Sequence, residues 1–205
     1  MSQHFEGLEN RTLFSVTIPA PILQAGLQVT SDASALRTQY RADVVDANAG
    51  LKAIVADLKT QPKSRASSLA LIKLKAAFSI ANAKNSVALS RYLAAGAADL
   101  VRLRSAYVAD LKKPTTANAA RLSRAITALQ DTTTLQDKLL TTGATGDTNI
   151  DAALTLLEAA NPTDTNLQTL VNSDETGGAS VYTAFSDQCN TINNDITNLV
   201  NLISA

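Results

Sequence analysis

One apolar seam of about fifty residues constrains this fold more than any other feature of the chain. Between Pro62 and Pro114, apolar side chains recur every three or four residues, which is the spacing of one helix face. Because proline fits the first turn of a helix and cannot continue one, we expect a helix from Pro62 to Lys112, about 75 Å long. The seam consists of Leu71, Leu74, Phe78, Asn82, Asn85, Leu89, Leu93, Gly96, Leu100, Leu103, Tyr107 and Leu111.

The first half of this segment carries a second apolar face. Burial on two sides requires extra neighbours, which come either from this chain or from another copy of it. Asn82 and Asn85 interrupt the first seam, where polar residues either fix the helix register or mark a kink. The second face consists of Leu69, Ile72, Ala76, Ile80, Ala83 and Val87.

The composition extends this prediction to the whole chain. Alanine, the strongest helix former, accounts for 35 of the 205 residues, and aromatic residues for only 4%. We therefore predict an all-α fold, an elongated antiparallel helical bundle with one very long central helix, as one domain over 31–205. Loops are expected at Gly143–Gly146 and Gly177–Gly178, a weak point at Thr132–Thr134, and breaks at Pro114 and Pro162. The further helices are expected at 31–60, 116–141, 148–160, 164–171 and 179–203.

Residues 1–30 differ from the remainder. Leu13 to Ile18 alternates apolar and polar residues, as a half-buried strand does, and Pro19 and Pro21 argue against a regular helix. We expect an extended arm that docks in a groove of its own bundle or on a neighbouring copy. The segment is too short and too interrupted to be a transmembrane helix.

The inventory of reactive side chains is small. His4 is the only histidine and Cys189 the only cysteine, so no Ser/His or Cys/His pair can form within the bundle. Cys189 lies on the seam of the last predicted helix, which favours a small buried apolar residue over an intermolecular disulfide. The pair Asp43 and Asp46 is expected on a helix surface, and Asp147 near a helix start. We therefore expect no enzyme, and no catalytic, cofactor-binding or metal-binding residues.

The charges are distributed unevenly although the net charge is zero. Residues 59–113 carry eleven basic and two acidic side chains, whereas 139–205 carries eight acidic ones and no Lys or Arg. Either oppositely charged helices pack together within one bundle, or complementary surfaces meet between subunits. The basic stripe Lys73, Lys84, Arg91, Arg102 and Lys113 could follow a phosphate backbone, but no stacking aromatics accompany it, so nucleic-acid binding is not expected.

One short motif carries a family resemblance. Leu8, Glu9, Arg11, Leu13 and Ser15 are spaced as in the N-terminal sorting motif of many exported planctomycete proteins, with Asn10 and Phe14 at two positions that differ from its usual form. The segment from Phe5 to Ser15 resembles that LEPR-type motif. The resemblance implies an exported or cell-surface protein and implies nothing about fold or activity. The alternative is that Leu8, Leu13 and Phe14 anchor the arm to the bundle.

These features together indicate a non-enzymatic structural protein, extracellular or at the cell surface. It would form a homo-oligomer through its helical seams and N-terminal arm, for example a filament. The alternative is a monomeric or dimeric helical module that binds another protein. No cofactor is expected in either case.

Overall fold

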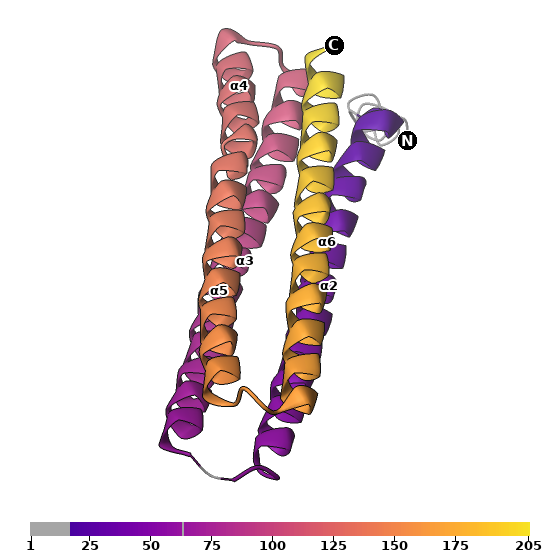
Figure 1. Cartoon of the computed structure of the whole chain (residues 1–205). Helices are drawn as coiled ribbons and strands as arrows, with labels where there is room; N and C mark the ends of the chain where they lie inside the picture. The colour runs from indigo at the N-terminus through magenta and orange to yellow at the C-terminus, as the bar shows by residue number, and fades with distance from the viewer. Residues whose placement is uncertain (1–16, 63) are drawn as a thin grey trace, which may run out of the picture.

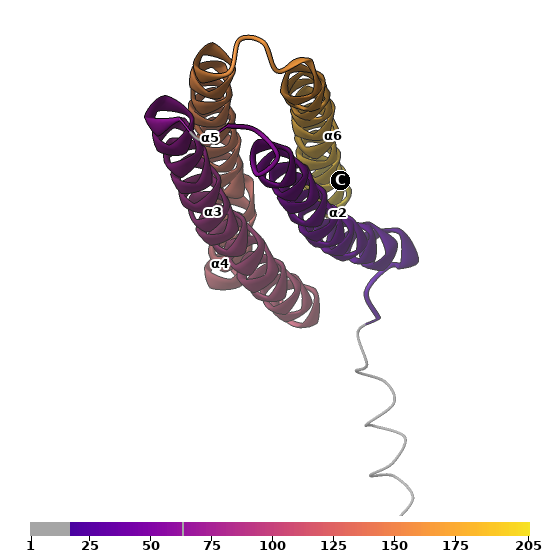
Figure 2. The same cartoon turned by 60° about the horizontal axis from the view of Figure 1, so that its bottom comes forward.

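The computed structural model describes residues 17–62 and 64–205, and every regular element among them is an α-helix. The helices stand in four columns, because α4 and α5 share one (Figure 1). Successive columns run in opposite directions, which confirms the predicted elongated, antiparallel all-α bundle. The longest helix, of 48 residues, occupies one corner of the bundle (Figure 2). The helices are α2 (Ala20–Leu58), α3 (Arg65–Lys112), α4 (Thr116–Gln130), α5 (Thr132–Ala160) and α6 (Thr165–Ser204).

Helix α2 begins eleven residues earlier than the sequence predicted, so the expectation of an extended arm is wrong for residues 20–30. Pro19 occupies the N-cap position, and Pro21 lies in the first turn, where the backbone N–H groups have no acceptor within the helix. The two prolines therefore lie at the start of the helix and do not prevent it, contrary to the prediction. Ala25 and Val29 of this additional segment are buried. The remainder of the predicted arm, residues 1–16, lies outside the described residues.

The prediction of loops at the two glycine-containing segments is also wrong. Helix α5 passes through Gly143 and Gly146, and α6 passes through Gly177 and Gly178. Glycine costs a helix only about 1 kcal/mol per residue, and buried apolar side chains flank both segments. At Gly146 the missing side chain has a use, because a Cβ there would lie 3.0 Å from the Cβ of Ala81 on α3. This glycine lets α5 approach α3 closely.

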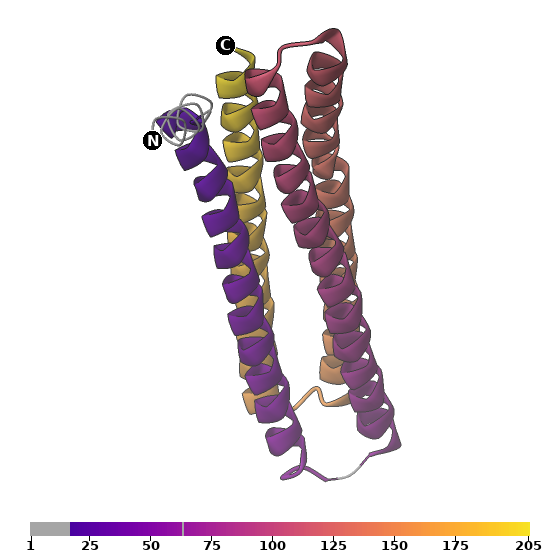
Figure 3. The same ribbon diagram turned by 180° about the vertical axis from the view of Figure 1, so that it is seen from behind.

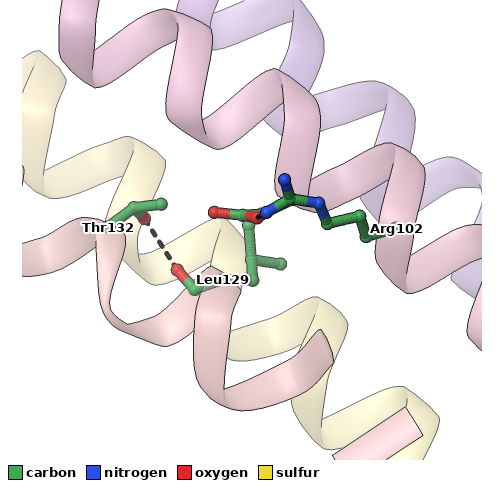
Figure 4. Close-up of polar contacts among 4 residues, drawn as sticks. Arg102, Leu129 and Thr132 are labelled. Carbon is green, nitrogen blue, oxygen red and sulfur yellow. Dashed lines mark hydrogen bonds and ion pairs between the residues drawn. The ribbon is translucent and has the colours of Figure 1, made fainter. Parts of the chain in front are cut away.

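The predicted weak point at Thr132–Thr134 coincides with the junction between α4 and α5. Asp131 separates the two helices. The Thr132 hydroxyl is buried and donates to the Leu129 carbonyl over 2.7 Å, which satisfies the last turn of α4 (Figure 4). Beside the junction, Arg102 of α3 forms an ion pair with Asp99 at 2.8 Å. The column is therefore interrupted by a local break at Asp131 and continues to Ala160 instead of ending at 141.

The links between columns follow the prolines, as predicted. Pro62, Pro114 and Pro162 each lie between two helices, and the next helix begins with a side-chain cap. The α2–α3 and α5–α6 links lie at the same end of the bundle (Figure 3). The caps are Ser64 for α3, Thr115 for α4 and Asp164 for α6, each accepting from the backbone N–H three residues later.

The columns associate as two pairs, α3 with α4–α5 and α2 with α6, which meet each other less closely (Figure 2). The buried apolar side chains form two separate clusters along the bundle. The upper cluster, at the end where α6 finishes, includes Cys189, which is fully buried as predicted. The lower cluster lies near the α2–α3 link and includes Ile54, Leu74 and Leu154. The middle of the bundle thus belongs to neither cluster.

The close approach at Gly146 can be tested with a pair of Gly→Ala variants. Alanine at Gly96 of α3 has open space around its Cβ, so we expect a gain in stability of about 0.5–1 kcal/mol from helix propensity. Alanine at Gly146 must push α5 away from Ala81, and we expect a loss of about 1 kcal/mol or more. Chemical denaturation of both variants checks this. Equal stabilisation by both substitutions would contradict the close α3–α5 packing.

Candidate functional site

A partly open cavity of about 680 Å³ occupies the middle of the bundle. Its walls come from four helices, α2, α3, α5 and α6, so it lies between the two helix pairs. Tyr40 and Phe185 of the upper cluster line it, and so does Phe78 of the lower cluster. The cavity therefore separates the two halves of the apolar core.

Small residues create this space. Four of the eight glycines in the chain line the cavity, together with four alanines. Because side-chain volume sets how fully four helices fill their common axis, glycine and alanine leave room there. The four glycines are Gly50, Gly143, Gly177 and Gly178.

Six carboxylates line the same cavity, and no Lys, Arg or His does. Burial raises the pKa of Asp147 to about 6, with a further contribution from the charge of Asp151. Burial also raises the pKa of Asp174, again with the charge of Asp151. The Asp174 carboxylate reaches towards α2, since a Cβ on Gly50 would lie 2.5 Å from its Oδ1. The six are Asp43, Asp46, Asp147, Asp151, Asp174 and Glu175.

Two of these carboxylates lie in other surroundings than the sequence predicts. Asp43 was expected on a solvated surface, but it is half-buried, and burial raises its pKa. Asp147 was expected near a helix start, whereas it lies within α5 and faces the cavity. Their position could not be predicted without knowing that α5 and α6 continue through their glycines, because those turns bring 147 and 174 into one space.

Three of the four aromatic rings that line the cavity, those of Tyr40, Tyr182 and Phe185, lie towards the upper cluster. The rings of Tyr40 and Phe185 lie 6.3 Å apart, centroid to centroid. The Tyr40 hydroxyl donates to the backbone carbonyl of Asn82 over 3.0 Å, and the Tyr182 hydroxyl donates to that of Leu140 over 3.3 Å. Both hydroxyls are thus held by backbone, and the ring surfaces are left to line the cavity.

The two asparagines of the α3 seam also line this cavity. The Oδ1 atom of Asn85 is buried and has no hydrogen-bond partner among the described residues. Helix α3 continues through Asn82 and Asn85 without a break, so of the two alternatives the helix break is not observed. The two asparagines that interrupt the apolar seam of α3 therefore lie at the level of the cavity, where the apolar core is interrupted as well.

A second surface feature lies on the outside of α3. The predicted second apolar face is exposed over Leu69, Ile72, Ile80 and Val87, with 52%, 63%, 53% and 51% of each residue accessible. We name these four residues the outer α3 face. A groove between α3 and α5 adjoins it, lined by Ile80, Leu156, Lys73 and Lys84 among others. No helix of the described chain covers this face, so the expected two-sided burial does not occur within the described residues.

The basic helix α3 packs closely against α5, which carries only acidic charges from 139 to 160, so helices of opposite sign do lie side by side, but no ion pair joins the two within the described residues. The one ion pair found in 17–62 and 64–205 joins Arg102 to Asp99, and both belong to α3. Over the same residues, no group of three His, Cys, Asp or Glu side chains is arranged to hold a metal ion. Helices of opposite charge are therefore not matched by ion pairs inside this part of the bundle.

Comparisons with protein-family models, with curated proteins and with solved structures find no match to this chain. None of the described helices has a stretch long and apolar enough to cross a membrane.

The raised carboxyl pKa values lead to a stability prediction. The folded-state pKa of Asp147 is about 6, above the ordinary value of 3.8. Burial and the neighbouring Asp32 also raise the pKa of Asp195 to about 6. The folded state then binds more protons than the unfolded state between about pH 4 and 6, so stability rises as pH falls through this window. The destabilisation is fully present above pH 6 and absent below pH 4.

We expect Asp147→Asn to raise the melting temperature at pH 7 by roughly 2–4 °C, corresponding to about 1 kcal/mol after allowance for solvent screening. The variant should also lose part of the gain in stability on going from pH 7 to pH 5. Asp187→Asn, at an exposed α6 position outside the cavity, is the control and should change little. Thermal melts of the three proteins at both pH values decide the matter, and an unchanged Asp147→Asn melt at pH 7 would contradict the account.

Proposed function

We propose that the protein is a non-enzymatic structural protein that self-assembles through the outer α3 face. The observation that carries the proposal is the exposure of four large aliphatic side chains along one stripe of one helix. They are spaced 3, 8 and 7 residues apart, and the exposed alanines Ala76 and Ala83 fill the gaps at helical spacing, so the six residues form one ridge on that helix. A contiguous exposed apolar surface of this kind typically marks a protein–protein contact.

The charges favour a second copy of the chain as the partner. Lys73 and Lys84 border the groove beside the outer α3 face. The last 67 residues, 139–205, contain no Lys or Arg and therefore present only acidic charges, including exposed Asp187. An apolar centre with a charged rim is the usual anatomy of an interface, and opposite rims steer two copies together. Because the basic and acidic surfaces belong to different helices, the contact would join unlike faces.

Contacts between unlike faces repeat from copy to copy. Such heterologous contacts build rings where the rotation closes and open helical assemblies where it does not. An elongated bundle with its contact face along the side suits a filament or a layer. The proposal of an exported or cell-surface location rests on the resemblance of residues 5–15 to the sorting motif, and these residues lie outside the described part of the chain.

A protein-binding module is the second candidate, and the groove beside Ile80 is the feature that favours it. An amphipathic helix of another protein would bury its apolar side in this groove and place acidic residues near Lys73 and Lys84. The two functions differ in one observable, since only the first makes the purified protein associate with itself.

We expect the purified chain to form species larger than a monomer at tens of micromolar and low salt, and to dissociate as salt rises, since the rim contacts are screened. The double variant Ile72→Gln and Ile80→Gln should shift the protein to monomer and leave its helicity unchanged, because both side chains are exposed. Val45→Gln is the matched control, an exposed aliphatic residue on α2 and therefore outside the outer α3 face. Sedimentation velocity and negative-stain microscopy provide the readout.

Two outcomes would contradict self-assembly through this face. One is a wild-type chain that stays monomeric throughout the concentration range, which would move the argument to the binding module. The other is an oligomer that the double variant forms as well as the wild type, which would place the contact elsewhere on the bundle.

A further inference from the structure

We propose that the cavity in the middle of the bundle binds an amphipathic organic cation, a molecule with an ammonium group and an aromatic or apolar body. The cavity of about 680 Å³ falls within the size range of small-molecule sites, roughly 300–1,000 Å³. It combines apolar and aromatic walls with a few convergent polar groups, as such sites do. This site is distinct from the outer α3 face, and the proposal does not depend on self-assembly.

Most of the rings and most of the carboxylates lie at two different levels of the cavity, although Phe78 belongs to the lower cluster and Asp43 lies one helical turn from Tyr40. Tyr40, Tyr182 and Phe185 line one level, and they belong to the turns next to the upper apolar cluster. Asp147 and Asp174 line the other. The Tyr182 ring lies over Gly143, where a Cβ would be 3.3 Å from the ring atom Cε2, and Gly143 and Asp147 are four residues apart on α5, or about 6 Å along the helix axis. A ligand that fills this length presents its apolar body to the rings and its charge to the carboxylates.

The sign of the ligand charge follows from the cavity lining. Half-buried carboxylates meet there without a basic side chain in the lining, and their pKa values are raised by burial and by one another. Each negative charge is therefore held at a free-energy cost that a positive ligand removes. An anion such as a phosphate would increase the same repulsion. The aromatic walls add to the preference, because ring faces attract ammonium groups.

An organic cation fits this lining better than a bare metal ion. A divalent metal needs several oxygen ligands at about 2.0–2.6 Å, and no three acidic side chains of the described residues are arranged for this. An ammonium group makes longer contacts and keeps its charge at a distance from each carboxylate. The Oδ1 atom of half-buried Asn85, which is itself buried and has no hydrogen-bond partner among the described residues, offers a further acceptor on the cavity wall.

The probe for the test is benzyltrimethylammonium, which has one aromatic ring and one quaternary ammonium group. Toluenesulfonate, of similar size and opposite charge, is the control ligand. We expect saturable binding of the cation to the full chain in calorimetry at pH 7.5, and at least tenfold weaker binding of the anion. In the amide spectrum, Gly143, Gly177 and Gly178 line the cavity and should shift, whereas Gly26 and Gly96 lie outside it and should not.

The double variant Asp147→Asn and Asp174→Asn should bind the cation at least tenfold more weakly. Removal of two repelling charges should also raise its melting temperature, so lost binding cannot be confused with lost folding. Asp187→Asn is the matched control and should bind as the wild type does. The proposal is overturned by absence of saturable cation binding, by equal binding of toluenesulfonate, or by shifts confined to glycines outside the cavity. Undiminished binding by the double variant would overturn it as well.

Discussion

Burial of two separate apolar clusters, one at each end of the bundle, is the interaction on which the remainder of the structure depends. Leu36, Leu103 and Leu129 of the upper cluster and Leu74, Leu154 and Val171 of the lower one are almost completely removed from water. At about 25 cal/mol per Å² of apolar surface, such side chains provide most of the free energy that holds the columns together. Helices without a strong propensity of their own are stabilised by this packing.

The apolar clusters at the two ends hold the helices together, so the middle of the bundle does not need a well-packed apolar core. Glycines and carboxylates that would disrupt a continuous core are tolerated between the clusters, where they leave a cavity with raised pKa values at Asp147 and Asp174. A natural bundle that gives up core packing and accepts charge repulsion at one level commonly does so for function. The outer α3 face is a second place where stability is given up, because apolar side chains are exposed to water there. In the proposed function another molecule covers them.

The sequence predicts the parts of this fold that depend on local pattern. The 3–4 spacing of the seam between Pro62 and Pro114 predicts α3 correctly, and the seam of the last helix predicts that Cys189 is buried. The errors occur where tertiary packing overrides local preference. Glycine by itself indicates a loop, but Gly146 is needed within α5 for the close approach to Ala81. Pro21 is compatible with α2 because it lies in the first turn, where the backbone N–H groups have no acceptor within the helix. The cavity could not be predicted, because it depends on which turns of four distant helices lie at one level.

Hydrogen exchange measured along the whole chain by mass spectrometry tests the division of the core most directly. Local opening is easiest where few apolar contacts are buried. The account predicts two slowly exchanging blocks, centred on the upper and lower clusters, separated by faster exchange in residues 143–151 and 173–180. Uniform protection along α5 and α6, or slowest exchange at the level of Asp147 and Asp174, would show that the bundle has one continuous core and would contradict the account.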